Sequence, residues 1–287
     1  MEFKTIKERN KYLIDNQKEI ISLKKAQIKA CDPFILNDSI DIEVKRFAAK
    51  AIGAERDDED TDDVIYRTVV GNSYLWMDSH EDVHMKNCFK ASLAQKDANR
   101  ISHLHDHIHQ ITAKVGKFLE VYEADIKWSE LGIEKDGKTQ ALFGYSEIQK
   151  EMNESVFRQY KSGDIDQHSV GMRYISVKFA LNDKDYPEAY AEWNKVYPML
   201  GNPEKADERG YFYCVYEAGL IEISCVLNGS NELTPAYFAC VKYRNENHID
   251  MQRDVYNGSE YEFWTRHEAT IAALGEAIRI YESKHPF

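Results

Sequence analysis

Two short strings and a third, more distant one carry side chains that could catalyse acyl transfer. The first string, residues 103–109, holds alternating histidines: His103, His105, His107 and His109. The second, residues 169–172, begins with Ser169. An imidazole can act as a general base, and a serine hydroxyl becomes a nucleophile when such a base removes its proton. Glu222 offers a carboxylate that could orient the base, so the three segments predict a serine-type hydrolase site if they converge.

The histidine string has three interpretations. Alternate residues of a strand share a face, so the four imidazoles would point one way and Leu104 and Ile108 the other. A metal site is one interpretation, because histidine is the commonest metal ligand. Neighbours two apart on one strand seldom suffice alone, and no His-Glu-x-x-His pattern accompanies them. A general base with bystanders and a plain polar strand face are the other two.

The serine string predicts a strand with one polar face. Ser169, Gly171 and Arg173 alternate with the apolar Val170, Met172 and Tyr174 over this segment. Gly171 would leave room for a substrate backbone. Arg173 could help to hold an oxyanion, although an ordinary surface arginine fits the pattern as well.

Glu222 interrupts an apolar strand. The residues Ile221, Ile223, Cys225 and Leu227 would form one face, with Glu222 and Ser224 on the other. A carboxylate in such a strand is costly unless it is solvated or paired. An imidazolium partner would explain it, and so would an ordinary salt bridge.

Taken in order, these segments resemble the prohead serine proteases of tailed phages, whose fold is related to that of the herpesvirus assemblin proteases. The similarity spans about residues 64–235 and rests on residues 74–83 with 87–93, residues 104–107 with Gly116, residues 169–172, and the closing set Glu222, Ser224 and Asn231. The interval from His107 to Gly116 is about two residues longer than the family pattern. This departure leaves His105 and His109 as alternatives to His107. Gly229-Ser230 replaces a Pro-Ala pair before Asn231.

The resemblance implies catalytic roles for His107, Ser169 and Glu222, with no cofactor and no metal. It implies an endopeptidase that cuts the scaffold protein and the major capsid precursor inside the assembling procapsid, in the host cytoplasm, and that can also process itself. It further implies a homo-oligomer. Two alternatives remain: a protease-like assembly protein in which Ser169 has no catalytic function, and a metal-binding protein built on the histidine string.

The fold class predicted is α+β, with a mostly antiparallel, barrel-like core and surrounding helices. The strands we expect are residues 64–70, 73–77, 100–110, 117–128, 139–145, 167–181 and 211–227. The helices we expect are residues 87–98, 146–162, 186–200 and 260–283. Gly71-Asn72 would join the first two strands as a hairpin, and residues 201–210 would form a loop.

Four segments are predicted along the chain. They are an amphipathic N-terminal helix (1–31), an extended and acidic linker (32–63), the protease-like domain (64–235) and a C-terminal helical segment (236–287). Isoleucines and leucines recur every seven residues in the first segment, so we expect one continuous helix that needs a partner surface. That partner could be its own domain, another protein or a second copy.

Composition limits the classes of function. The chain has 287 residues, 43% of them hydrophobic, and a formal net charge of −12, which argues against nucleic-acid binding. Its five cysteines form no Cys-x-x-Cys pair, so neither a disulfide framework nor a thiolate zinc site is indicated. No apolar run is long enough for a membrane span and no signal region follows Met1, so we expect a cytoplasmic protein without a membrane partner.

Overall fold

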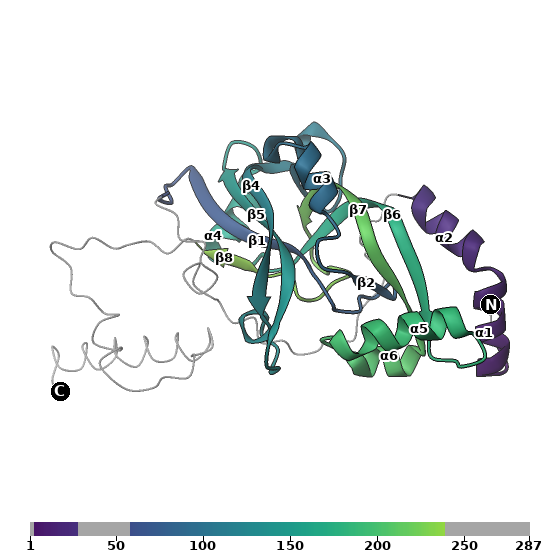
Figure 1. The fold of residues 1–287 in the computed structure, drawn as a ribbon. Helices are drawn as coiled ribbons and strands as arrows, with labels where there is room; N and C mark the ends of the chain where they lie inside the picture. The colour runs from purple at the N-terminus through teal and green to yellow at the C-terminus, as the bar shows by residue number, and fades with distance from the viewer. Residues whose placement is uncertain (1–2, 28–57, 239–287) are drawn as a thin grey trace, which may run out of the picture. The chain divides into compact units, whose positions relative to one another are not determined.

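The structure is a computed structural model that describes residues 3–27 and 58–238. The chain divides into the units Met1–Val241 and Lys242–Phe287, and every described residue belongs to the first unit (Figure 1). The predicted helix over 260–283 and most of the predicted linker lie outside the described residues. Among the residues described, no helix is both long and apolar enough to cross a bilayer.

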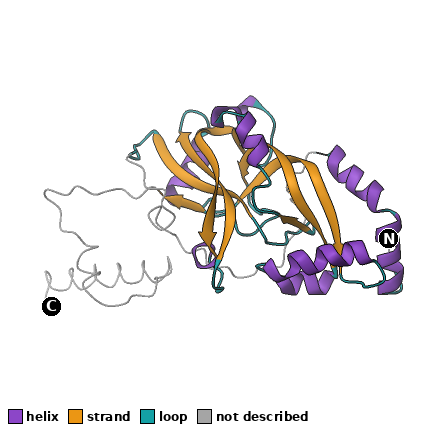
Figure 2. Cartoon of the chain, in the orientation of Figure 1, coloured by secondary structure: helices purple, strands orange, loops and turns teal. Residues whose placement is uncertain are grey.

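Helices and strands alternate irregularly along the described chain (Figure 2). The helices are α1 (Ile6–Asp15), α2 (Gln17–Ala26), α3 (Lys90–Gln95), α4 (Glu154–Ser162), α5 (Pro187–Val196) and α6 (Pro203–Arg209). The strands are β1 (Val64–Ser73), β2 (Asp82–His84), β3 (Ser102–His105), β4 (Lys114–Lys127), β5 (Lys138–Gln149), β6 (His168–Leu181), β7 (Tyr211–Cys225) and β8 (Ala236–Phe238). The predicted α+β class is therefore confirmed.

One eight-stranded sheet organises these elements. The hydrogen-bonded order is β2-β7-β3-β4-β5-β1-β8, and β6 pairs along β7. β2 and β3 follow one another along one edge of β7 and run parallel to it, whereas the other pairs are antiparallel. Within the described residues no ladder joins β6 to β8, so the sheet is open. β7 therefore has neighbours on both edges, with β6 on one edge and β2 and β3 on the other.

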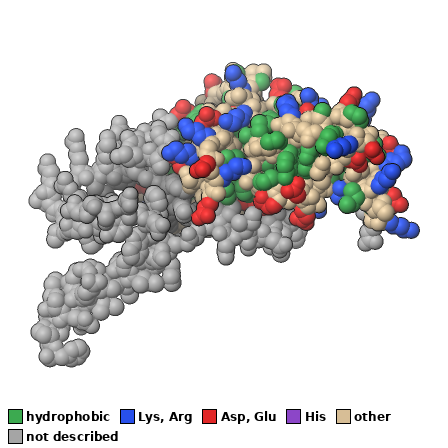
Figure 3. Space-filling view, turned by 60° about the horizontal axis from the view of Figure 1, so that its bottom comes forward, with side chains coloured by type: hydrophobic (Ala, Val, Ile, Leu, Met, Phe, Trp, Pro, Cys, Tyr) green, Lys and Arg blue, Asp and Glu red, His purple; other side chains and the backbone are tan. Residues whose placement is uncertain are grey.

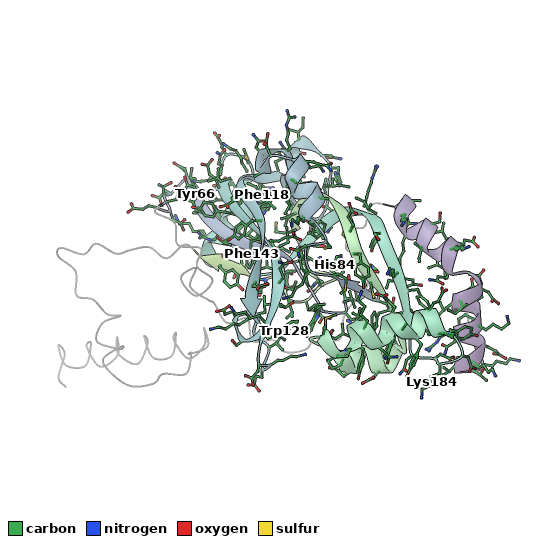
Figure 4. The ribbon with its side chains drawn as sticks, in the orientation of Figure 1. Tyr66, His84, Phe118, Trp128, Phe143 and Lys184 are labelled. Carbon is green, nitrogen blue, oxygen red and sulfur yellow. The ribbon has the colours of Figure 1, made fainter. Side chains whose placement is uncertain are left out.

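Two large apolar clusters and one small one hold the elements together. Phe118 belongs to one large cluster, and Phe143 and Trp128 belong to the other (Figure 4). The small cluster packs Leu13 of α1 against Phe179 and its neighbours on β6 and β7. Each fully buried large apolar side chain contributes about 1.5–3 kcal/mol. On the face shown in Figure 3, acidic and basic side chains are interspersed around a hydrophobic area.

The predicted N-terminal helix is two helices rather than one. The chain leaves helical geometry at Asn16, whose side-chain amide donates a 2.8 Å hydrogen bond to the carbonyl of Tyr12. Asparagine competes in this way with the backbone ladder of a helix. The seven-residue stripe is therefore divided, and α1 carries the only buried residues of the two helices, Asn10 and Leu13.

The predicted hairpin at Gly71-Asn72 is wrong. β1 continues through both residues to Ser73 and stays paired with β5, with a bulge between Val70 and Asn72. A glycine inside a strand often marks such a bulge rather than a turn. The Gly71-Asn72 pair, which the sequence suggested to be a turn, therefore forms a bulge inside a continuous strand.

Three further boundaries differ from the predictions. β3 ends at His105 instead of continuing to residue 110. Residues 146–149 belong to β5, where Gln149 pairs with Val64, so the following helix begins only after its N-cap Asn153. The predicted loop 201–210 contains α6, which starts at Pro203 and ends before Gly210, as helices often do.

Candidate active site

The three predicted segments converge on the C-terminal part of β7. Ser224 lies opposite Ser169 of β6 on one edge and Leu104 of β3 on the other. Glu222 lies opposite Gly171 of β6. Neighbouring strands are about 4.8 Å apart, and residues directly opposite one another point to the same face. Ser169, Gly171, Glu222 and Ser224 therefore share one face of the sheet.

His107 reaches that face because the chain turns sharply after β3. Asp106 and His107 have φ values of 52° and 55°, a left-handed conformation that is uncommon for residues with side chains. The backbone N–H of Asp106 donates to the carbonyl of Cys225 at 2.9 Å, which ties the turn to the end of β7. Such strain persists only where contacts hold it, and it clusters at functional sites.

His107, Glu222 and Ser224 form a closed ring of hydrogen bonds. Nδ1 of His107 lies 2.5 Å from Oε1 of Glu222, and the Ser224 hydroxyl donates to Oε2 of the same carboxylate at 2.6 Å. The backbone N–H of His107 donates to the Ser224 oxygen at 3.2 Å. A carboxylate oxygen accepts hydrogen bonds, so Nδ1 of His107 is assigned as the donor in this contact. The sequence left either an imidazole partner or an ordinary salt bridge as the explanation for Glu222. In the structure, its partner is the imidazole of His107.

Gly171 provides the space for the carboxylate. A Cβ atom at this position would lie 2.2 Å from Oε1 of Glu222, far inside van der Waals contact. The sequence suggests that Gly171 makes room for a substrate backbone. In the structure, the space beside Gly171 is filled by the Glu222 side chain.

Ser169 is buried on the same face, directly across the ladder from Ser224. Opposed side chains of an antiparallel pair have Cβ atoms about 4.5–5.5 Å apart. Nε2 of His107 is buried and has no hydrogen-bond partner among the described residues, and no hydrogen bond joins it to Ser169. Catalytic hydrogen bonds are often long in the absence of substrate. The Ser169 hydroxyl and an imidazole nitrogen without a hydrogen-bond partner therefore lie on one face of the sheet, and no hydrogen bond joins them.

The other histidines of the string are dispersed, so the predicted single row is wrong. His103 is buried on the core face of the sheet, His105 pairs with Asp106 at 3.1 Å, and His109 is exposed. The row fails because the strand ends at His105 and the left-handed turn redirects His107. Within the described ranges, no three His, Cys, Asp or Glu side chains gather as metal ligands would.

A second histidine network lies on the opposite face of the sheet, and its residues come from β3, α4 and β6. His103 Nε2 is 3.0 Å from the Tyr160 hydroxyl, and that hydroxyl is 2.8 Å from Nε2 of His168. His168 Nδ1 is 2.9 Å from the carbonyl of Thr234, and His103 Nδ1 is 2.8 Å from the Ser146 hydroxyl. A carbonyl only accepts, so Nδ1 of His168 donates, the Tyr160 hydroxyl donates to His168, and His103 donates to Tyr160. Both rings are then neutral and every ring nitrogen has a partner.

Burial fixes the charge state of this second network. Both histidines are fully buried, and desolvation lowers the pKa of His168 to about 4 and the pKa of His103 well below its usual value. Burial also raises the pKa of the Cys225 thiol to about 12, so this cysteine beside the site is not a ready nucleophile.

Several residues differ from the expectations for the surrounding strands. Ile221 is the extra residue of a bulge, because Gly171 pairs with Glu222 and Met172 pairs with Leu220. Leu220 is buried in place of Ile221, and Leu227 is exposed rather than part of an apolar face. The Arg173 side chain is exposed.

Asn231 has a structural role. The side-chain amide of Asn231 donates to the carbonyl of Ser73 and to the side chain of Asn72, both at 2.7 Å. Three residues later, Thr234 binds His168, so the loop connects β1 with the start of β6.

The sequence did not predict that Tyr160 and His168 join His103 in a buried hydrogen-bond network. Only the position of His168 next to Ser169 was available as a signal.

Comparison with protein-family models, with curated proteins and with solved structures finds no significant match for this chain.

Proposed function

We propose that this chain is a serine endopeptidase of the prohead type, with Ser169 as nucleophile, His107 as general base and Glu222 as the carboxylate that orients it. The observation that carries the proposal is the hydrogen-bonded ring of His107, Glu222 and Ser224 on the face that also holds Ser169. A base oriented by a third group, close to a hydroxyl, is the arrangement by which serine hydrolases are recognised on unrelated folds.

In the proposed reaction, Ser169 Oγ attacks the carbonyl carbon of a peptide bond while Nε2 of His107 takes its proton. The imidazolium then gives that proton to the departing amine, which leaves an acyl ester on Ser169. Water, deprotonated by the same nitrogen, attacks the ester, and the proton returns to Ser169 when the acid product leaves. Glu222 stabilises the imidazolium through its 2.5 Å contact with Nδ1.

Ser224 has a positioning role in this scheme. Its hydroxyl holds the second oxygen of Glu222, and its oxygen holds the backbone of His107. The carboxylate is thereby fixed at both oxygens, which keeps the imidazole in one tautomer and one orientation.

The proposal includes the family's fold, a barrel-like core related to that of the herpesvirus proteases. Its support is the single, mostly antiparallel sheet together with the loop over 231–234. That loop binds Ser73 near one end of the strand order and His168 at the start of β6. These contacts bring two distant parts of the strand order together without a ladder between them.

The proposed substrates are the scaffold protein and the major capsid precursor of a phage, cut inside the procapsid in the host cytoplasm by a homo-oligomer. These assignments come from the resemblance alone. Self-cleavage belongs to the same proposal.

Co-expression with the major capsid precursor that is proposed as the substrate tests the proposal. We expect the wild-type chain to shorten the precursor and the Ser169→Ala chain to leave it intact, as followed by intact-mass spectrometry. Ser176→Ala, on the same strand, is the matched control and should process normally. Equal processing by wild type and Ser169→Ala would refute the assignment of Ser169.

A protease-like assembly protein is the second candidate. The burial of Ser169 and the lack of a hydrogen bond between it and His107 favour this alternative. It predicts that neither the wild-type nor the Ser169→Ala chain cleaves the precursor, while both are incorporated into assembling shells.

A further inference from the structure

Three large apolar side chains are exposed at the end of the sheet where the candidate site lies. They are Ile108, Ile111 and Leu227, whose fractional exposures are 38%, 89% and 87%. Ile111 and Leu227 are the two most exposed large apolar side chains among the described residues. A single exposed apolar side chain needs no explanation, but several at one place often mark a binding surface.

The segments that lead to Ile108 and Leu227 are held next to one another. The last residues of β3 and β7, His105 and Cys225, lie opposite each other in the parallel ladder. Directly after them, the backbone N–H of Asp106 donates to the carbonyl of Cys225 at 2.9 Å. Ile108 and Leu227 follow this last rung along their two strands, so both lie beyond the same end of the sheet.

That end of the sheet also holds the two reacting side chains of the proposed site. Ser169 is the second residue of β6 and lies next to the terminal pair of His168 and Cys225. His107 directly precedes Ile108, and its Nε2 is buried without a hydrogen-bond partner among the described residues. The exposed isoleucines thus continue the chain from the proposed base and not from the proposed nucleophile.

The proposed reaction determines which part of a substrate lies on the histidine side. His107 gives its proton to the departing amine, so the substrate residue that carries this amine lies next to the imidazole. The acyl part stays on Ser169. A side chain on the amine-carrying residue would therefore extend toward the residues that follow His107. An apolar side chain there would be removed from water together with Ile108 and Leu227, which is favourable.

We propose that Ile108, Ile111 and Leu227 form a subsite for the side chain of the substrate residue that supplies the departing amine. The substrate class is then a peptide with a large aliphatic residue, such as leucine, directly after the cleaved bond. This inference rests on the proposed endopeptidase function and on the roles proposed for Ser169 and His107.

Transfer of an acyl group from Ser169 to an amine tests this subsite on the full chain without the natural substrate. p-Nitrophenyl acetate acetylates the serine and releases p-nitrophenolate, and an added amino-acid amide then competes with water for the acetyl group. The amine nitrogen attacks the ester carbonyl and His107 takes its proton, the C–N bond forms, the ester C–O bond breaks, and the proton passes to the Ser169 oxygen. This step is the reverse of acylation, so the amide occupies the place of the departing amine.

The amide with the larger apolar side chain should react faster. Leucinamide should capture the acetyl group at least about tenfold more efficiently than glycinamide, as measured by mass spectrometry of the two acetylated amides. Leu227→Ser and Ile108→Ser should each lower this ratio by at least about threefold. Leu119→Ser, which removes an exposed leucine from β4, is the matched control and should keep the wild-type ratio. Equal capture of the two amides, or an unchanged ratio in Leu227→Ser, would overturn the subsite.

The release of p-nitrophenolate separates failure of the subsite from failure of the proposed function. A burst that is present in wild type and absent from Ser169→Ala shows acylation of this serine, so a missing preference for leucinamide then counts against the subsite alone. The same release from both chains would refute the proposed function and the subsite with it. Light scattering tests a second copy as the occupant: dissociation of an oligomer by Leu227→Ser with an unchanged amide ratio would contradict the subsite.

Discussion

The two histidine networks lie on opposite faces of the same stretch of β7 and differ in how completely their hydrogen bonds are satisfied. On the core face, His103 and His168 are joined through Tyr160, and every ring nitrogen has a partner. On the other face, His107 is oriented at Nδ1 by Glu222, and its Nε2 has no partner among the described residues. Every ring nitrogen of the first network is satisfied, whereas the second has a ring nitrogen without a partner on the sheet face that also carries Ser169.

Residue type alone does not distinguish a structural histidine from a candidate general base. Burial without a charged partner keeps His168 neutral, with its pKa lowered to about 4. His107, by contrast, contacts a carboxylate, which in the proposed reaction stabilises the proton that the imidazole takes up. The distinction depends on which face of β7 each ring occupies, and the turn at Asp106 decides that for His107.

Breaking the orientation of His107 should have the largest effect. Glu222→Gln preserves size but allows the amide to donate to Nδ1, which favours the wrong tautomer. We expect proteolytic activity to fall by about 10³–10⁴-fold, in line with the loss of the carboxylate from other triads. Precursor cleavage rates measure the loss, and circular dichroism confirms the fold. A fall of less than tenfold would remove Glu222 from the proposed triad.

Acidification should destabilise the saturated network. His168 has a pKa near 6.5 when unfolded and about 4 when folded, so between these pH values the unfolded chain binds more protons. Stability is therefore lost as the pH falls from about 6.5 to about 4, by about 3 kcal/mol for this histidine. His103 shifts in the same direction and should add to the loss.

Urea unfolding at a series of pH values measures this slope. His168→Gln should reduce it, and His109→Gln, at an exposed position, should leave it unchanged. Identical slopes for wild type and His168→Gln would contradict the assignment of a neutral, buried His168.

Filling the space beside Glu222 should affect both stability and activity. In Gly171→Ala, the new Cβ would lie 2.2 Å from Oε1, so the carboxylate must move away from His107. We expect a loss of about 1–3 kcal/mol, typical of overpacking, together with a fall in activity. Gly219→Ala on β7 is the matched control, because its Cβ would come no closer than 3.8 Å to a neighbour. Wild-type behaviour of Gly171→Ala would show that the carboxylate is not confined there.

Removing one hydroxyl from the saturated network should have the smallest effect. Tyr160→Phe leaves Nε2 of both His103 and His168 without its partner, which should cost about 1–2 kcal/mol in the free energy of unfolding. Activity per folded molecule should change little. Tyr197→Phe, which loses a solvent-exposed hydrogen bond to Asp207, controls for the loss of a hydroxyl. Equal stabilities of the two variants would mean that the network contributes nothing measurable.

Local patterns were sufficient to predict much of the sheet. The runs that became β4, β6 and β7 are rich in β-branched and aromatic residues, and the alternation around Glu222 and Ser224 placed both on the face they occupy. The strand pairing that joins Ser169 to Ser224 depends on contacts between distant segments. Sequence alone could therefore nominate the residues of the site but not their juxtaposition.

Other features left weak or ambiguous signals. The left-handed turn at Asp106 and His107 contains no glycine or proline, and its geometry depends on the tertiary contacts with Cys225 and Glu222. Helix α6, in contrast, carries the usual markers, a proline at its first residue and a glycine after its last. Tyr160 comes from a helix that reaches two strands at once, which no local pattern indicates.

Labelling with a fluorophosphonate, followed by peptide mapping, tests the central claim most directly. The reagent forms a stable ester with a serine only when a neighbouring base activates the hydroxyl. The account predicts stoichiometric labelling of Ser169 in the wild-type chain, no labelling of Ser224, and loss of the label in His107→Ala. An unlabelled Ser169, or one that is labelled equally well without His107, would contradict it.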